Sequence, residues 1–241
     1  MAARIILLLL TTVAIFAEVK SLLSETLATQ GEFPSIAIIH VSEDEVTIGV
    51  LVTPHRILTA WTVIQFHDYR RMRVQLGCLT VENCETPLLR PTHCIPNPAY
   101  STLMIVLRSS VVSSPTVKPA PIGSSIGYSG RNCTFVAFHS EDDQALASID
   151  VQILERNLCR SVLGVNIPEK QACFDDSSVP SSITEDDYGG PILCDGTVIG
   201  IMIDYHMTGR TPRVPQRMSN FTMFDQLPDP GSLLYQAAVR R

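Results

Sequence analysis

The stretch Asp187–Gly196 reads DYGGPILCDG, and it restricts the fold more than any other part of the sequence. Its two glycines and proline form a turn, and the apolar run Ile192–Cys194 that follows is typical of a β-strand. Short apolar runs of this kind recur along the chain every ~8–15 residues, with Gly, Pro or Asn turns between them. The pattern predicts an all-β protein with few helices.

The strands expected from this pattern share alternating or continuous apolar residues bounded by turn residues. They are Ser35–Val41, Val46–Val52, Arg56–Ala60, Met72–Leu76, Met104–Leu107, Thr134–Phe138, Ala147–Leu154, Ile192–Cys194 and Thr197–Ile203. Helices are expected at Arg156–Leu163 and near Ser219. The Ser- and Pro-rich stretch Ser109–Ser125 is interpreted as a connection between two β-halves.

The N-terminal residues 1–17 are typical of a signal peptide, because Arg4 precedes an apolar run and Ala17 offers a small residue for cleavage. A membrane anchor is the alternative, but the run from Ile5 to Ala17 is shorter than the ~20 residues that span a bilayer. We therefore expect a secreted protein with no membrane attachment after the signal is removed.

Charge argues against nucleic-acid binding, because the chain carries a formal net charge of -6 and such binding needs a basic face. Arg70, Arg71 and Arg73 form the densest basic cluster, and we interpret them as a solvated loop. His93 and Cys94 are adjacent, but no spaced set of Cys and His ligands suggests a metal site. No cofactor is expected.

Seven cysteines in a secreted chain predict disulfides, and their odd number leaves at least one free or paired with another chain. Two Asn-X-Ser/Thr motifs, at Asn220 and Asn132, are predicted glycosylation sites. The first is the stronger prediction, because the second has Cys133 in its middle position.

The sequence DYGGP at Asp187–Pro191 resembles the nucleophile motif Gly-Asp-Ser-Gly-Gly-Pro of the chymotrypsin/trypsin serine proteases. Matches in the same order support this resemblance: GEFP at 31–34, the run Leu51–Ala60 before the catalytic histidine, and Asn97–Leu107 around the catalytic aspartate. The resemblance covers about residues 31–224. It is to the catalytically inactive homologues of this family, which are frequent in insects.

The resemblance implies two six-stranded antiparallel β-barrels with a short C-terminal helix. On this basis the trypsin-like domain is residues 18–226. Its first barrel is about 30–112, its second about 120–216 and its helix about 219–226. Residues 227–241 form a tail.

Comparison with the family motifs places Thr62 at the histidine position, Tyr188 at the serine position and Thr102 at the aspartate position; Leu103 takes the last place if the register shifts by one. Asp186 stands where the oxyanion hole has a glycine. An alcohol cannot act as a base near pH 7, and a carboxylate does not stabilise a developing oxyanion. We therefore expect no catalytic residues here and predict that the chain is not an enzyme.

The same comparison implies an altered specificity pocket and a set of disulfides. Ser182 is at the pocket base, and Ile203, Asp204 and Tyr205 replace the usual Ser-Trp-Gly wall. The family pairings correspond to Cys133–Cys194 and Cys159–Cys173. Of the extra cysteines Cys78, Cys84 and Cys94, any two could pair, and Cys78–Cys84 is the preferred choice.

The leading functional hypothesis is a secreted binding or regulatory protein, for example in a protease cascade or in seminal fluid. Its partner would be a protease, an inhibitor or another secreted protein. Two alternatives stay open: an active serine-type endopeptidase with displaced catalytic residues, in which His55 or His67 would replace the lost base, and a scaffold that shields a ligand. The sequence does not set the oligomeric state.

Overall fold

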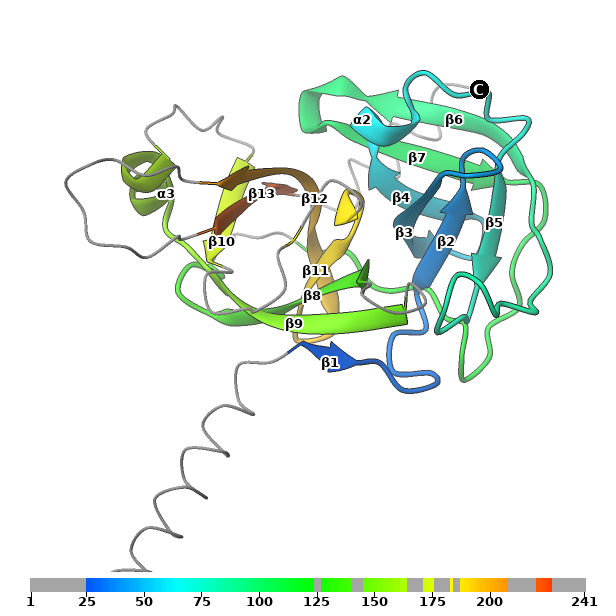
Figure 1. Ribbon diagram of the computed structural model, residues 1–241, viewed down its shortest axis with the longest axis horizontal. Coiled ribbons are helices and arrows are strands. Elements are labelled where there is room, and N and C mark those ends of the chain that lie inside the picture. The colour runs from blue at the N-terminus through cyan, green and yellow to red at the C-terminus, as the bar shows by residue number, and fades with distance from the viewer. Residues whose placement is uncertain are drawn as a thin grey trace, which may run out of the picture.

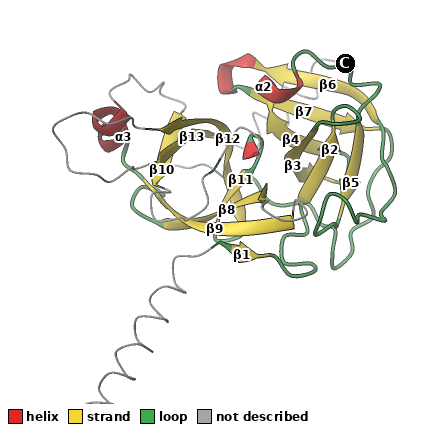
Figure 2. Cartoon of the chain, in the orientation of Figure 1, coloured by secondary structure: helices red, strands yellow, loops and turns green. Residues whose placement is uncertain are grey.

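The protein folds into two antiparallel β-sheets with few helices (Figure 1, Figure 2). A computed structural model describes residues 25–123, 127–139, 145–163, 171–175, 183, 187–207 and 220–226. The predicted signal segment 1–17 and tail 227–241 lie outside this range. The all-β, trypsin-like fold expected from the sequence is confirmed.

The first sheet has the strand order β5-β2-β3-β4-β7-β6. Its strands are β2 (Ile36–His40), β3 (Val46–Thr53), β4 (Arg56–Ala60), β5 (Arg73–Leu76), β6 (Pro91–Asn97) and β7 (Thr102–Leu107). An antiparallel bridge between Val74 and Leu89, just before β6, joins the two edges. This bridge closes the sheet into a barrel.

The second sheet has the order β1-β9-β10-β13-β12-β11-β8, and β8 also pairs with β9. Its strands are β1 (Thr26–Leu27), β8 (Asn132–His139), β9 (Ala145–Ile153), β10 (Gln171–Asp175), β11 (Pro191–Cys194), β12 (Thr197–Met207) and β13 (Asn220–Gln226). The β8–β9 pairing connects six of these strands in a ring, and β1 adds to β9 outside it.

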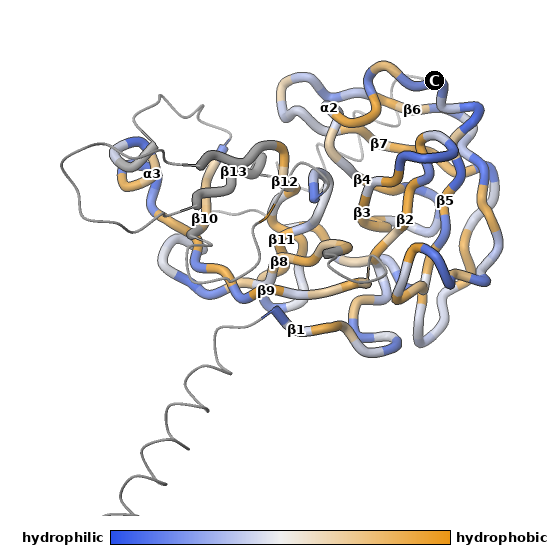
Figure 3. The backbone as a smooth tube through the Cα atoms, viewed as in Figure 1, coloured by the Kyte–Doolittle hydropathy of each residue, from blue (hydrophilic) through white to orange (hydrophobic). Residues whose placement is uncertain are grey.

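Apolar residues fill each barrel and the seam between the barrels, and Figure 3 shows them along the strands while the connecting loops are more hydrophilic. The seam cluster draws Val50, Leu58 and Met104 from the first sheet and Val198 and Ile201 from the second. Fully burying such a side chain contributes roughly 1.5–3 kcal/mol. The two sheets are therefore held together by shared apolar packing.

The predicted C-terminal helix at about 219–226 is wrong, because Asn220–Gln226 is the strand β13. This strand pairs with β10 on one side and with β12 on the other. Its sequence, NFTMFDQ, is rich in aromatic and β-branched residues that favour strands. Pairing on both edges gives its backbone more hydrogen bonds than an isolated two-turn helix would provide.

The other predicted helix is confirmed at α3 (Arg156–Leu163). Four short elements were not expected from the sequence: β1, β10, the helix α2 (Trp61–Ile64) and the 3-10 helix η1 (Pro98–Tyr100). The strand β6 was also missed, because its sequence PTHCIPN contains two prolines and no regular alternation.

Three disulfides are present, Cys78–Cys84, Cys133–Cys194 and Cys159–Cys173, and they are the three pairs expected from the sequence. Cys94 of β6 is the remaining cysteine and is free. It packs against the core of the first barrel. Burial raises the pKa of the Cys94 thiol to about 12.

We expect Cys94 to resist alkylation in the folded protein. With its pKa at about 12, its thiolate fraction at pH 8 is roughly 10³-fold below that of an exposed cysteine. Iodoacetamide labelling followed by mass spectrometry should therefore be slow in the native protein and should rise with pH above 8. The same protein unfolded without reductant serves as the control and should label at one cysteine. Equal rates in the native and unfolded protein would contradict this prediction.

Candidate functional site

The helix α2 follows β4 directly and carries the residue that the resemblance places at the position of the catalytic histidine. Its second residue, Thr62, is exposed to solvent. The backbone N–H of Trp61 donates to the carbonyl of Ser101 at 2.8 Å, which ties α2 to the start of β7. The segments carrying Thr62 and Thr102 are thereby brought together.

Thr102 begins β7 and is fully buried. Within the part of the chain that the structure describes, its Oγ1 is buried without a hydrogen-bond partner. It lies opposite Ala60, the residue before α2. Leu103, the alternative at this position, is also buried and packs in the core of the first barrel.

Tyr188 lies in the turn directly before β11, and the backbone of this turn is hydrogen-bonded to both sheets. Its carbonyl accepts a hydrogen bond from Thr47 Oγ1 of β3 at 2.8 Å. The next residue, Gly189, donates its N–H to the carbonyl of Met202 in β12 at 3.0 Å. The turn is therefore fixed by hydrogen bonds to strands of two different barrels.

The glycines of this turn permit an unusually close approach between the barrels. Gly189 has φ +94°, and a Cβ there would collide with the Ile48 carbonyl and the Thr59 hydroxyl. A Cβ on Gly190 would lie 2.6 Å from the ring of Phe135. Both positions therefore require glycine for space, and Gly189 requires it for backbone conformation as well.

The Tyr188 side chain is partly buried and packs against two clusters, the core of the second barrel and the seam cluster. Val63, the neighbour of Thr62, packs against the same seam cluster. The seam cluster therefore links the α2 segment to the Tyr188 turn, and a backbone hydrogen bond links α2 to the residue before Thr102.

The chemistry available at these three positions is two aliphatic hydroxyls and one phenol. Two histidines were considered as substitutes for the lost base. His67 Nε2 lies 3.2 Å from Glu45 Oε2, and His55 lies in the turn between β3 and β4, where its backbone carbonyl accepts the N–H of Leu107. The assignment of Thr62, Thr102 and Tyr188 as non-catalytic stays a prediction.

The predicted specificity pocket is only partly described. Ser182 and the oxyanion position Asp186 lie outside the described residues. Ile203 is buried in the seam cluster. Asp204 and Tyr205 continue β12, where they pair with Met223 and Thr222 of β13. Ile203–Tyr205 therefore forms a paired strand rather than a loop.

The predicted glycosylation sites fall on strands. Asn132 is exposed at the start of β8, next to the disulfide-bonded Cys133. Asn220 begins β13. Glycosylation at both positions stays a prediction.

Sequence analysis missed Thr47 as a site residue. Its hydroxyl joins β3 of the first barrel to the Tyr188 turn. A threonine inside the mostly apolar run Val46–Val52 was the available indication in the sequence.

A pocket of about 480 Å³ opens along the seam, with Phe33, Lys118, Pro121, Leu193 and Asp195 among its lining residues. None of the residues predicted to form the site lines it. Across the described ranges, no group of three or more His, Cys, Asp or Glu side chains could hold a metal ion. No helix there is long and apolar enough to cross a membrane.

Comparison with known proteins gives consistent results. The family model described as Trypsin matches residues 24–224. Mast cell protease 8 of Mus musculus is 29% identical over 106 residues, which cover 44% of this chain and 40% of that protein. Mast cell protease 3 of Ovis aries is 32% identical over 81 residues, covering 34% and 32%. The matches thus span less than half of each relative.

Among solved structures, the chain is similar to neuropsin, described as a serine protease expressed in the limbic system of mouse brain. The TM-score is 0.72 at 19% identity, covering 89% of this chain and 98% of neuropsin. At this identity the likeness concerns the fold alone.

The prediction that the chain is not an enzyme is wrong against these findings. The similar proteins are named as proteases, and nothing shows a loss of activity in this chain. The prediction rested on the residue types at Thr62, Thr102, Tyr188 and Asp186, which do not exclude catalysis by other groups.

We expect Gly189→Ala to destabilise the protein much more than Gly130→Ala. Both residues have positive φ, but a Cβ at Gly130 meets nothing within 4 Å, whereas at Gly189 it collides with β3 and β4. The backbone strain of alanine at positive φ costs about 1–2 kcal/mol in either variant. Overpacking against β3 and β4 adds about 1–3 kcal/mol at Gly189 alone. Urea unfolding of both variants measures the difference, and equal midpoints would show that the barrels do not constrain the turn.

Proposed function

The chain belongs to the trypsin family, and we propose that it is a secreted member that acts by binding a protein partner. The observation that carries this proposal is the rigid attachment of the Tyr188 turn to both barrels. Thr47 and Met202 hold this turn from opposite sheets. A surface whose backbone is fixed before binding loses little conformational entropy when a partner docks.

The surface next to this turn suits recognition of a polypeptide. Thr62 is exposed on α2, and Tyr188 presents a partly buried aromatic ring packed on the same seam as Val63. Aromatic rings with apolar support are enriched at protein interfaces. Loops and short helices on a rigid scaffold are also the usual carriers of binding function.

Secretion is part of the proposal. It is supported by the signal-like residues 1–17 and by the disulfides Cys78–Cys84, Cys133–Cys194 and Cys159–Cys173, which form in oxidising compartments. A regulatory role in a protease cascade or in seminal fluid fits the resemblance to insect homologues. The partner would then be a secreted protease or an inhibitor.

Cleavage of a bound polypeptide is the second candidate function, and the names of the relatives favour it. Partner binding is compatible with it, because a protease must also bind the chain that it cleaves. Catalytic groups other than Thr62, Thr102 and Tyr188 would then carry the reaction. A ligand-shielding role has less support, because exposed polar residues such as Lys118 and Asp195 line the seam pocket.

We expect purified protein to retain a specific secreted partner with a Kd near or below ~1 μM. Thr62→Lys should weaken this binding about tenfold, because it places a long charged side chain beside the Tyr188 turn. The exposed linker residue Ser113, changed to Lys, is the matched control and should leave the Kd unchanged. Biolayer interferometry with the identified partner measures both. Absence of any partner at this concentration, or equal weakening by both variants, would count against the proposal.

The second candidate is tested on the same preparation. Covalent labelling by a serine-directed phosphonate, abolished by mutation of one serine, would establish proteolytic chemistry. Labelling that no serine mutation removes would argue against it.

A further inference from the structure

Three arginines that are far apart in sequence lie side by side across the closure of the first barrel. Val74 and Leu89 pair in an antiparallel bridge, so the preceding residue Arg73 lies opposite the following residue Arg90. Pairing of β6 with β7 then places Arg90 beside Arg108, whose N–H donates to the Arg90 carbonyl at 2.9 Å. Cross-strand neighbours share one face of a sheet, so these three side chains form one row.

This row has no acidic counterpart in the described part of the chain. Within the described ranges, no carboxylate forms an ion pair with Arg73, Arg90 or Arg108. Like charges placed directly opposite each other on a sheet destabilise the fold. The row occurs in a chain of net charge -6, so it is a local concentration of positive charge. An acidic ligand would relieve the repulsion.

The turn before β5 extends the row with two more arginines. Arg73 Nη1 donates to the carbonyls of Arg70, Arg71 and Met72 at 3.1, 3.0 and 2.6 Å, which braces the turn. The exposed guanidinium of Arg70 lies 5.8 Å from the ring centre of Tyr69. The sequence suggested that Arg70, Arg71 and Arg73 form a solvated loop. In the structure they are part of a larger charged surface that these hydrogen bonds hold in place.

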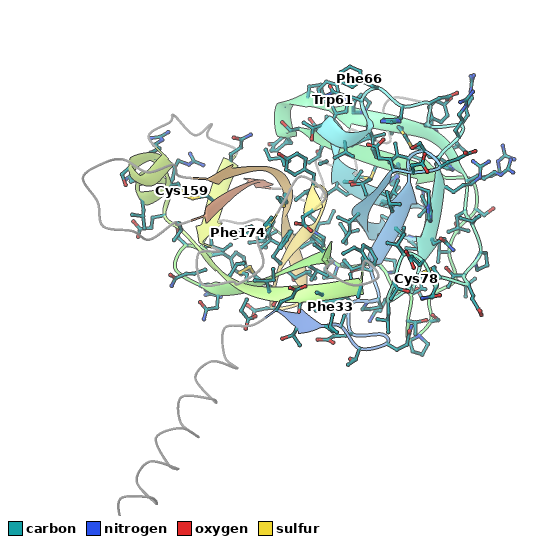
Figure 4. The ribbon with its side chains drawn as sticks, in the orientation of Figure 1. Phe33, Trp61, Phe66, Cys78, Cys159 and Phe174 are labelled. Atoms are coloured by element: carbon teal, nitrogen blue, oxygen red, sulfur yellow. A yellow bond between two sulfur atoms is a disulfide. The ribbon has the colours of Figure 1, made fainter. Side chains whose placement is uncertain are left out.

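An exposed phenylalanine precedes Arg70 by four residues in the same connection between α2 and β5. Phe66 follows α2, and 88% of its surface is exposed. Figure 4 shows Phe66 and Trp61 at the α2 end of the first barrel, away from β1. Two carboxylates lie near this segment: Asp68 Oδ1 accepts the backbone N–H of Arg70, and Glu45 lies beside His67. Five arginines outnumber them. Aromatic and arginine side chains are the residue types enriched in interface hot spots.

We propose that this aromatic–arginine surface, formed by Phe66, Arg70, Arg71, Arg73, Arg90 and Arg108, binds an acidic polypeptide segment that carries apolar side chains. The inference rests on the proposed function and specifies the surface and the partner's chemistry. Charge complementarity selects an acidic ligand, and Phe66 selects a polypeptide over a sulfated polysaccharide, because only a polypeptide supplies an apolar anchor.

The test uses three labelled peptides, each with four repeats: Glu-Glu-Leu-Gly, its neutral analogue Gln-Gln-Leu-Gly, and Glu-Glu-Ser-Gly, which lacks the apolar anchor. Fluorescence anisotropy should show tightest binding of Glu-Glu-Leu-Gly, weakening as salt rises from ~50 to ~300 mM because screening shortens the range of the charges. The double variant Arg70→Glu, Arg71→Glu should weaken binding at least tenfold. Phe66→Ser should weaken it several-fold and remove the preference for Leu over Ser.

Matched controls come from the other side of the molecule. Lys118→Glu reverses an exposed charge beside the seam pocket, and Leu27→Ser removes an exposed apolar side chain of β1. Neither should change the affinity. Thermal unfolding of every variant checks folding, and the wild type's melting temperature should rise with added Glu-Glu-Leu-Gly peptide.

Equal binding of acidic and neutral peptides, or equal effects of control and surface variants, would overturn the inference. Binding of heparin without binding of Glu-Glu-Leu-Gly would also overturn it, since the surface would then recognise charge alone. If the secreted partner binds normally to the Arg70/Arg71 double variant, the inference fails while the proposed function stands. If no partner binds but the peptide pattern holds, the surface stands and the proposed function fails.

Discussion

The contact of the Gly189–Gly190 turn with the first barrel is the constraint on which the rest of the structure depends. Gly189 lies so close to the carbonyl of Ile48 and the hydroxyl of Thr59 that no side chain fits. Gly190 packs equally closely against Phe135 in the second barrel. Because interiors are packed to crystal-like density, the Gly189 contact limits how the two barrels approach each other, and the Gly190 contact seats the turn on β8 of the second barrel.

This close approach also determines where Tyr188 lies in the candidate site. Thr47 and Met202 bind the turn from opposite barrels, so Tyr188 has one position relative to α2. Its ring packs on the seam that also supports Val63. The Tyr188 turn and α2 are therefore both attached to the packed seam of the trypsin-like fold. A rigid frame of this kind positions a binding surface equally well whether or not the bound chain is cleaved.

The arginine surface depends on a different feature, the closure of the first barrel. The Val74–Leu89 bridge brings Arg73 next to Arg90, and the β6–β7 pairing adds Arg108. The bracing of the preceding turn by Arg73 holds Arg70 and Arg71 in place. The molecule thus presents two ordered regions, the part of the seam at α2 and Tyr188 and the charged surface on the first barrel.

The sequence by itself determined the all-β class, most strands and the helix α3, because these depend on short apolar patterns bounded by turn residues. The family resemblance, carried by motifs in the same order, supplied the pairings Cys133–Cys194 and Cys159–Cys173. It did not determine β13, whose short segment suits a helix or a strand until β10 and β12 offer hydrogen bonds on both edges. Only the tertiary structure joined Thr47 to Tyr188 and placed Arg73, Arg90 and Arg108 in one row. The physical reason is that strand register and barrel closure set which distant residues become neighbours, and neither is encoded in any local stretch.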